Sequence, residues 1–489
     1  MVPRRQGLPR FYKLHKARYF EGDLRTSCFR IGVLALAGVC FTFSSRSWAS
    51  SASHAPCRVQ STTFEGWRGE ELMNDWVRLT VVPQLGGRLM QVEFGGHRYL
   101  FVNPKYKGKY FPPTGSGQKR EWFNYGGDKL WPLPEGHSEG QWPGPFADQL
   151  DDGEYKLSVV SGNNSCTLHL DGPSDPETGL QYSRDISIGG DSPQISFHAV
   201  MSNTSDHPIR WSMQSVTQYD TGDSRTYSAT QANYNRDFWA FAPVNPQSAY
   251  ADGYRVRNGL ADDPSYAVHD GMFSLHWLYL ENEVWLDSRA GWIAVVDDSA
   301  KYGIVERFQY FAGEEYPGKA SVIFYKNGAA LELDDTGMPA LRSNHPDEAP
   351  YYMEAEINSP MRRLNPGASY ALDTWWFPVR ASKELKTVTL AGIVEHPLAA
   401  SLSADRLRLS GTFGVFFVGK LNAHIFDLHG VESNVVEVEN VDPLQPVELN
   451  KTISASPGAT RVTIHLNDEQ GIDRGSLGEA EIMIVRKDS

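Results

Sequence analysis

Apolar and polar residues alternate in short runs along most of this chain, as they do in β-strands. The run VRLTVV at 77–82 and the run RLMQVEF at 88–94 flank the turn sequence PQLGG at 83–87, which predicts a hairpin. From Trp76 onward, similar runs recur between Gly, Asn, Asp and Pro, and almost none has the 3.6-residue period of a helix. The pattern therefore predicts an all-β fold.

Turn residues predict further hairpins at 162–164, at 189–193, and at Asn327 and Gly328. Each of these hairpins would add two strands to a large antiparallel sheet system, which we expect to end near the WWF sequence at 375–377. Residues 381–386 are typical of a linker. We therefore predict a large first domain over residues 58–382.

The chain after about Val388 has fewer tryptophans and a run of strand-like segments, among them AHIFDLHG, VVEVENV and TRVTIHL. Their spacing predicts a small immunoglobulin-like or fibronectin-like β-sandwich of about seven strands over residues 387–489. We find no catalytic constellation in this segment. It would serve as a spacer, a brace or a secondary binding surface.

The N-terminus has the composition of a secretory leader. Its first thirty residues are basic, and the apolar run IGVLALAGVCFTF at 31–43 is shorter than the ~20 residues that a membrane-spanning helix needs. We expect a signal peptide over residues 1–49 with cleavage after Ala49, a periplasmic or secreted protein, and no integral membrane span once the leader is removed. Cys57 and Cys166 would remain, either as a disulfide or as two buried thiols.

Charge excludes one class of partner. The whole chain carries a net charge of −13, and removal of residues 1–49, with nine Lys/Arg and two Asp/Glu, brings it to −20. Nucleic-acid binding is therefore not expected, and neutral sugars suit this charge better. We expect no cofactor and no metal site, because phosphate-cradling glycine patterns and metal-ligand spacings are both missing; the acidic pairs at 297–298 and 334–335 are the remaining candidates for calcium.

The segment 122–148 concentrates aromatic side chains among glycines, prolines and polar residues. Aromatic rings stack on the C–H face of a pyranose while polar groups bind its hydroxyls, so this composition indicates a sugar site. The alternative is that the tryptophans pack a long loop onto the sheet. The candidates are Asn124, Lys129 and Glu135 as hydrogen-bonding groups, Trp131 and Trp142 as stacking platforms, and Asp128 as an acid-base group.

Glu354 and Glu356 lie two residues apart in a predicted strand, which places both carboxylates on one face, roughly 7 Å apart. One carboxylate whose pKa is raised by its like-charged neighbour can act as an acid while the other remains a base. The alternative is a surface ion-pair network with Arg362 and Arg363.

Imidazole commonly serves proton transfer near neutral pH, and His276 and His269 are the best histidine candidates because they lie among aromatic and acidic residues. We assign His276 to the catalytic group and His269 to substrate binding. Arg88, in the turn after PQLGG, is a further substrate-binding candidate because its fork of donors can hold a hydroxyl or carboxylate. Each of the three also has a plain structural alternative.

Several segments together resemble the galactose-mutarotase-like (aldose 1-epimerase) superfamily. The segment NDWVRLTVVPQLGGRLMQVEFGGHRYLF resembles its opening strands, NYGGDKLWPLPE its Gly-Gly…Trp-Pro segment, AVMSNTSDHPIRWSMQSVTQYD its central strand pair, and YMEAEINSPMRRLNPGASYALDTWW its closing strand pair. The resemblance covers roughly 59–380 and is nearest to a bacterial branch of unknown function. It implies a supersandwich of large antiparallel sheets with a saccharide in a cleft on the concave face.

The resemblance also implies site residues. Either Glu354 or Glu356 matches the position of the family's catalytic base. The general-acid histidine expected on the central strand pair is replaced by the sequence SVTQY at 215–219, where Gln218 becomes a substrate-binding candidate. Ordinary mutarotation is thereby put in question.

Three functions follow as hypotheses. The first is an enzyme acting on carbohydrate by acid-base chemistry, as an epimerase-like isomerase or otherwise as a lyase or glycosidase. The second is a saccharide-binding or sensing module without turnover. The third is an envelope-associated structural protein with no small ligand.

Overall fold

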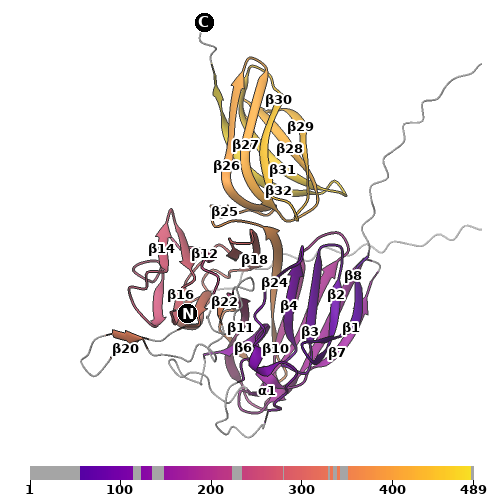
Figure 1. Ribbon diagram of the computed structural model, residues 1–489, viewed down its shortest axis with the longest axis vertical. Coiled ribbons are helices and arrows are strands. Elements are labelled where there is room, and N and C mark those ends of the chain that lie inside the picture. The colour runs from indigo at the N-terminus through magenta and orange to yellow at the C-terminus, as the bar shows by residue number, and fades with distance from the viewer. Residues whose placement is uncertain are drawn as a thin grey trace, which may run out of the picture. The chain divides into compact units, whose positions relative to one another are not determined.

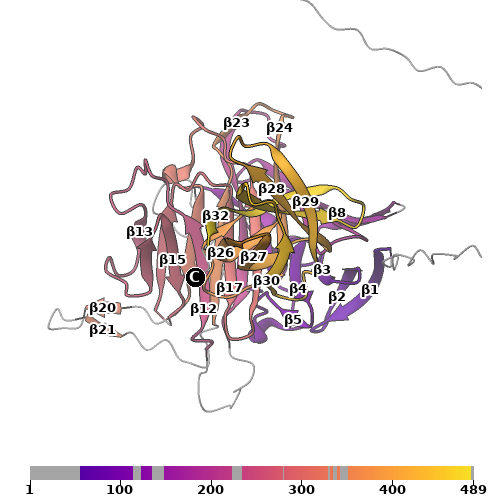
Figure 2. The ribbon, with the colours of Figure 1, turned by 90° about the horizontal axis from the view of Figure 1, so that it is seen from above.

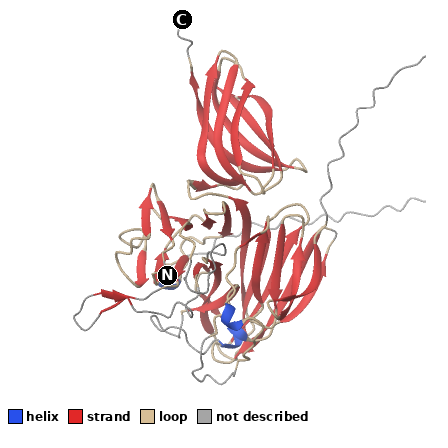
Figure 3. Ribbon diagram, in the orientation of Figure 1, coloured by secondary structure: helices blue, strands red, loops and turns tan. Residues whose placement is uncertain are grey.

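The structure, a computed structural model, describes residues 56–113, 123–134, 148–162, 164–222, 234–278, 280–328, 331–333, 339–341 and 351–485, of which 331–333 and 339–341 by backbone alone. Strands dominate these residues (Figure 3). The helical elements among them are α1 (Asp148–Asp152) and the 3-10 turns η1 (Pro104–Tyr106) and η5 (Pro317–Lys319). The all-β fold class predicted from the alternation is confirmed.

The first large sheet has twelve strands, and β1, β2, β3 and β4 lie side by side in it (Figures 1 and 2). Its order is β1 (Arg58–Phe64), β2 (Trp67–Met73), β3 (Val77–Val82), β4 (Arg88–Phe94), β6 (Asp128–Leu133), β11 (Ile209–Asp220), β22 (Tyr352–Asn358), β19 (Val322–Lys326), β16 (Asn282–Leu286) and β13 (Arg255–Asn258), with β5 (His97–Arg98) beside β4 and β23 (Arg362–Leu364) beside β11.

The second large sheet has ten strands, all paired antiparallel. Its order is β14 (Tyr266–His269), β15 (Met272–His276), β12 (Phe238–Pro243), β17 (Trp292–Asp297), β18 (Tyr302–Phe308), β24 (Ser369–Arg380), β10 (Ile195–Asn203), β9 (Leu180–Gly189), β8 (Ser165–Asp175) and β7 (Lys156–Ser161).

The two large sheets bury one apolar core between them, with Leu79 and Met213 from the first sheet and Ile186 and Phe197 from the second. In β9 every second residue is buried, as expected for a strand that packs one of its faces against a core. The disulfide between Cys57, next to β1, and Cys166 on β8 joins the two sheets, with 5.9 Å between their Cα atoms. Of the two alternatives for these cysteines, the disulfide is the one that forms.

Most of the predicted hairpins are present. The PQLGG turn joins β3 to β4, and Gly86 and Gly87 have φ values of 64° and 63°, a conformation that favours glycine. The turns at 162–164 and 189–193 join β7 to β8 and β9 to β10. The hairpin predicted at Asn327 and Gly328 is wrong: β19 ends there, pairs with β16 and β22, and the Asn327 amide donates to the carbonyl of Tyr352.

The C-terminal strands form an eight-stranded sheet system rather than the seven strands predicted. Its order is β29 (Glu432–Val441), β28 (Gly419–Asp427), β31 (Ala459–Asp468), β32 (Asp473–Ile484), β26 (Gly392–Ser403), β27 (Arg406–Val415) and β30 (Val447–Ser454), with β25 (Thr387–Val388) beside β26. Only the β26–β32 pair in it is parallel. A separate two-stranded sheet joins β20 (Leu331–Leu333) and β21 (Pro339–Leu341).

The predicted linker at 381–386 lies between β24 and β25. The predicted leader, residues 1–49, lies outside the described residues. No helix in the described part of the chain is long and apolar enough to cross a membrane.

Candidate functional site

Strand β11 lies in the middle of the twelve-stranded sheet, between β6 and β22. In the register, Val216 is opposite Lys129 on one side and Glu356 on the other, and Gln218 is opposite Glu354. Residues opposite one another, or two apart, share a face of a sheet. We call this face the carboxylate face; it carries Lys129, Trp131, Gln214, Gln218, Glu354 and Glu356.

The carboxylate face points away from the ten-stranded sheet. The alternate residues of β11 make the contacts to that sheet, since Tyr219 donates a hydrogen bond of 2.5 Å to Glu306 of β18. Even so, the side chains of the carboxylate face are largely shielded from solvent: Gln218 is 0% exposed, Glu356 6% and Glu354 8%. Polar groups shielded to this degree need partners.

Two glutamines supply those partners. The Gln218 Nε2 donates to Glu354 Oε1 at 2.5 Å, and the Gln214 Nε2 donates to Glu356 Oε2. Burial raises the pKa of Glu354, opposed by the Gln218 hydrogen bond, the charge of Lys129 and a hydrogen bond with Glu356. The two carboxyl groups lie two residues apart in β22 on one face, where one can act as an acid and the other as a base.

The alternative ion-pair network of these glutamates with Arg362 is wrong. Arg362 lies on β23, and its Nη1 is 3.0 Å from Oε2 of Glu314. Arg363, also on β23, is paired in register with Arg210 of β11 and is not a neighbour of Glu354. The carboxylate face thus holds its acids with amides.

Lys129 completes one end of the carboxylate face. Its Nζ lies 2.8 Å from Oδ1 of Asp151 on α1 and 4.2 Å from the ring centroid of Trp131. Asp151 therefore fixes the ammonium group next to the carboxyl pair. Asp151 was not among the residues singled out from the sequence, because nothing in its spacing relates it to Lys129.

Arg88, on the neighbouring strand β4, lies on the same side of the sheet as Lys129, since the adjacent Leu89 is opposite Asp128. Its side chain is 0% exposed, and it donates to Asp151 Oδ1 at 2.5 Å and to the carbonyl of Gly126 at 3.2 Å. The Arg88 guanidinium therefore donates to other groups of the protein itself. Arg88 thus acts on Lys129 through their shared partner Asp151.

Asn124 holds the turn that leads into β6. Its Oδ1 accepts from the Gly126 amide at 3.2 Å, and a Cβ at Gly126 would lie 2.1 Å from the carbonyl oxygen of Phe101. The glycines of the NYGGD sequence are therefore required by close backbone packing and by φ values of 94° and 77°. Asn124 is buried and its role seen here is in this turn.

Asp128 is not brought to the carboxylate face. It neighbours Lys129 in β6, so it points to the opposite side, where it forms an ion pair with Arg184 of β9 and accepts from Thr217 Oγ1 at 3.0 Å. Asp128 and Lys129 were predicted in one candidate segment, but β alternation sends these two charged residues to different faces.

The two candidate histidines also lie elsewhere. His276 is on β15 in the ten-stranded sheet, where it stacks on Trp239 at 4.3 Å and contacts the carbonyl of Arg236. His269 is an exposed residue of β14 in the same sheet. Neither histidine joins Glu354 and Glu356. Glu135 and Trp142 lie outside the described residues.

Sequence reasoning missed Gln214 as well as Asp151. Gln214 has the same strand parity as Gln218, so the alternation in RWSMQSVTQY carries a signal that could have identified it.

The acidic pairs suggested for calcium give no metal site in the described part of the chain, where no group of three or more His, Cys, Asp or Glu side chains is arranged around a common point. Asp298 instead lies 2.6 Å from Lys301 Nζ. The pair at 334–335 is outside the described residues.

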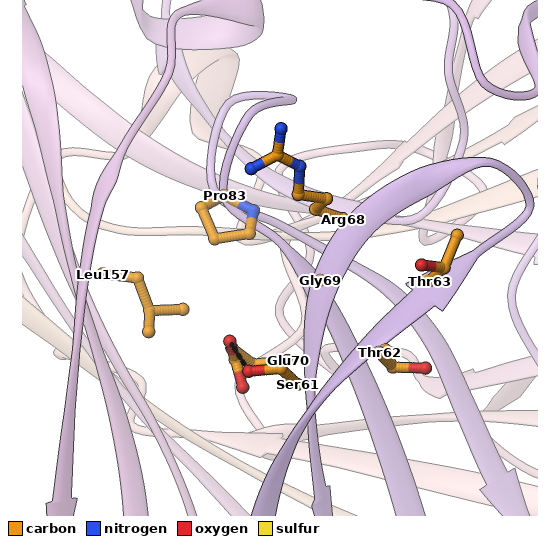
Figure 4. A pocket seen from close by; sticks show the side chains of 8 residues that line it. All are labelled: Ser61, Thr62, Thr63, Arg68, Gly69, Glu70, Pro83 and Leu157. Atoms are coloured by element: carbon orange, nitrogen blue, oxygen red, sulfur yellow. Dashed lines mark hydrogen bonds between the residues drawn. The ribbon is translucent and has the colours of Figure 1, made fainter.

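A surface pocket lies at the other end of the twelve-stranded sheet, between β1, β2 and β7 (Figure 4). Inside it, Ser61 Oγ donates to Glu70 Oε1 at 2.7 Å. None of the candidate site residues takes part in this pocket, which is lined by Ser61, Thr62, Thr63, Arg68, Gly69, Glu70, Pro83 and Leu157.

No protein-family model matches the sequence, and no curated protein matches it significantly. Solved structures are similar at low identity. A TPR-domain containing protein from Parabacteroides distasonis is 15% identical over 64% of this chain, with a TM-score of 0.42, and the chain spans 47% of its length.

A Klebsiella pneumoniae protein provisionally named an aldose 1-epimerase is 14% identical over 67% of this chain and 85% of its own, with a TM-score of 0.44. A galactose mutarotase-like protein from Clostridium acetobutylicum is 8% identical over 66% of this chain and 99% of its own, with a TM-score of 0.40. Galactose mutarotase-like proteins thus recur among the structures to which this chain is similar.

Proposed function

We propose that the carboxylate face binds a saccharide and that the Glu354–Glu356 pair transfers a proton to or from it, in an epimerase-like isomerisation. One observation carries the proposal: two shielded carboxyl groups lie two residues apart on one face, and each is held by a glutamine of β11. A carboxyl pair that shares one proton contains both an acid and a base.

The surroundings of the pair suit a sugar. Gln214 and Gln218 offer amide groups for hydroxyls, and Lys129 offers a cation held by Asp151. The Trp131 indole lies on the same face, buried beneath the Lys129 ammonium. A few polar groups beside an aromatic platform are typical of small-molecule sites. This arrangement supports a polar, uncharged ligand that is turned over by proton transfer.

A second candidate is saccharide binding or sensing without turnover. Its support is that His276, His269 and Asp128 all lie away from the carboxylate face, which leaves the glutamate pair without the additional acid-base groups that were anticipated. In that case the same side chains would hold the sugar and nothing would be converted.

We further propose that the protein is exported, to the periplasm or the medium. The disulfide between Cys57 and Cys166 supports this location, because such bonds persist in oxidising compartments and are rare in the cytosol. The leader-like composition of residues 1–49 agrees with it.

The test combines calorimetric binding with exchange of sugar anomers followed by NMR, over a panel of mono- and oligosaccharides. Glu354→Gln and Glu356→Gln should each lower turnover about 10²–10⁴-fold, the usual contribution of a general acid or base. Asp373→Asn is the control, because this exposed carboxylate pairs with His198 on the ten-stranded sheet.

The outcomes separate the hypotheses. Turnover that is lost in both glutamate variants and kept in the control supports proton transfer by the pair. Binding with unchanged anomer exchange in the wild type supports the binding module. A protein that binds no sugar of the panel contradicts both.

A further inference from the structure

The carboxylate face does not end at β22. The register continues through β19 and β16 to the edge strand β13, with a shift in β13 between Val256 and Asn258. Two neighbouring rows of opposed residues cross these strands on the same face. The first row is Lys129, Val216, Glu356, Ile323, Trp285 and Arg255; the second is Gln218, Glu354, Tyr325, Glu283 and Asn258.

The far end of these rows carries its own aromatic platform, Trp285. Its indole Nε1 donates to the Oε1 of Glu283, and its ring packs directly on Gly318, where a Cβ would lie only 1.9 Å from a ring carbon. The orientation of the ring is therefore fixed from two sides. A fixed aromatic ring binds at little entropic cost.

Two guanidinium groups lie over the ring of this platform. The Cζ atoms of Arg255 and Arg257 lie 5.9 and 5.7 Å from the centroid of the Trp285 ring. An aromatic ring, two guanidinium groups and the Glu283 carboxyl make a second set of sugar-binding groups. We call Arg255, Arg257, Glu283 and Trp285 the distal patch.

Exposure increases along the rows toward the distal patch. Gln218 is 0% and Glu354 8% exposed, whereas Trp285 and Arg257 are half-buried and Arg255 is exposed. One end of the rows is thus enclosed and the other is open to solvent. A ligand that reaches the carboxyl pair has its free end at the distal patch.

The length of the rows exceeds one sugar ring. From β22, which carries Glu354 and Glu356, to β16, which carries Trp285, there are two strand steps. At about 4.7–4.9 Å a step, the carboxyl pair and the Trp285 indole are separated by roughly 9.5 Å across the sheet. A monosaccharide at Glu354 and Glu356 would leave the distal patch without contact.

We propose that the ligand is an oligosaccharide whose terminal residue lies at Glu354 and Glu356 and whose following residues run along the rows to the distal patch. This inference rests on the proposed function of the carboxylate face and specifies its substrate class. It assigns Trp285 as a stacking platform and Arg257 as a hydrogen-bond donor to the distal sugar residue.

The experiment begins with a glycan array that identifies a bound sugar, followed by calorimetry on the homologous series of that glycan from one to six residues. In the wild type, affinity should rise at least tenfold between the monosaccharide and the tetrasaccharide. Trp285→Ala should remove that gain while leaving monosaccharide affinity within about twofold, since stacking on an aromatic ring is a local interaction.

Two further variants guard against simple misfolding. Arg257→Gln truncates no ring and should lower the gain with length by several-fold. Trp239→Ala removes an indole of the ten-stranded sheet, outside the rows, and should leave the whole series unchanged.

The outcomes test the oligosaccharide inference separately from the proposed function. Equal affinity for all lengths, or a length dependence that survives both Trp285→Ala and Arg257→Gln, overturns the oligosaccharide inference and leaves the proposed function standing. An array without any bound glycan overturns both. If Trp285→Ala loses the rise in affinity with glycan length but keeps its monosaccharide affinity, the result supports sugar binding at the distal patch.

Discussion

The two faces of β11 use similar polar side chains for different purposes. On the side of the second sheet, Thr217 and Tyr219 contact Asp128 and Glu306, and Arg184 of β9 pairs with Asp128. On the carboxylate face, Gln214 and Gln218 hold Glu356 and Glu354. Both faces bury two acids.

The difference lies in where the partners come from. The acids on the core side have partners from the opposite sheet, so Asp128 and Glu306 link the two sheets and their interactions break when the sheets separate. The acids of the carboxylate face have glutamine partners on the same sheet. The first arrangement is that of a brace and the second is the one that we propose as a site, and this contrast can be tested.

The largest expected effect on stability comes from removing Arg184, the cation that pairs with Asp128 and links the two sheets. Arg184→Met leaves Asp128 buried without its ion-pair partner, which should lower the free energy of unfolding by about 3–5 kcal/mol. Urea denaturation followed by tryptophan fluorescence measures it. The double variant Arg184→Met/Asp128→Leu should recover much of the loss, and a loss below about 1 kcal/mol for the single variant would contradict the brace.

The second effect is a dependence of stability on pH. Burial raises the pKa of Glu306 from 4.5 to about 8, opposed by the Tyr219 hydrogen bond and reinforced by the charge of Asp128. The folded state therefore keeps a proton that the unfolded state loses, and the stability this provides is complete below about pH 4.5 and is lost as pH rises toward 8.

Between these values, stability should fall by about 1.4 kcal/mol per pH unit from this group. Denaturation curves at a series of pH values measure the slope, and Glu306→Gln, which is neutral at every pH, should flatten it. A Glu306→Gln variant with the slope of the wild type would show that another group is responsible.

The smallest effect concerns the carboxylate face. Gln218→Leu removes the hydrogen bond that lowers the pKa of Glu354, so Glu354 should titrate at higher pH than in the wild type. The carboxyl carbon signals in NMR follow this titration. Thr217→Val, the neighbouring change on the opposite face, should leave it in place, and an equal shift in both variants would mean that the two faces are not separate.

Local pattern determined much of this protein. The alternation in β9 and β10, the turn glycines at 86 and 87, and the common face of Glu354 and Glu356 all follow from a period of two residues and from the φ values that glycine allows. These features depend on neighbours in the chain, so the sequence alone predicts them.

Tertiary structure decided which strands meet and which face of each became the site. The sequence put Asp128 and Lys129 in one candidate segment, but only the pairing of β6 with β11 shows that Lys129 joins the glutamates and Asp128 the core. The contacts of Asp151 with Lys129 and Arg88 likewise depend on how the strands pair, and the sequences of the connecting loops do not predict that pairing. Alternation repeats every two residues wherever a strand lies, whereas strand order is set by the burial of whole sheet faces, and that burial is a property of the folded chain.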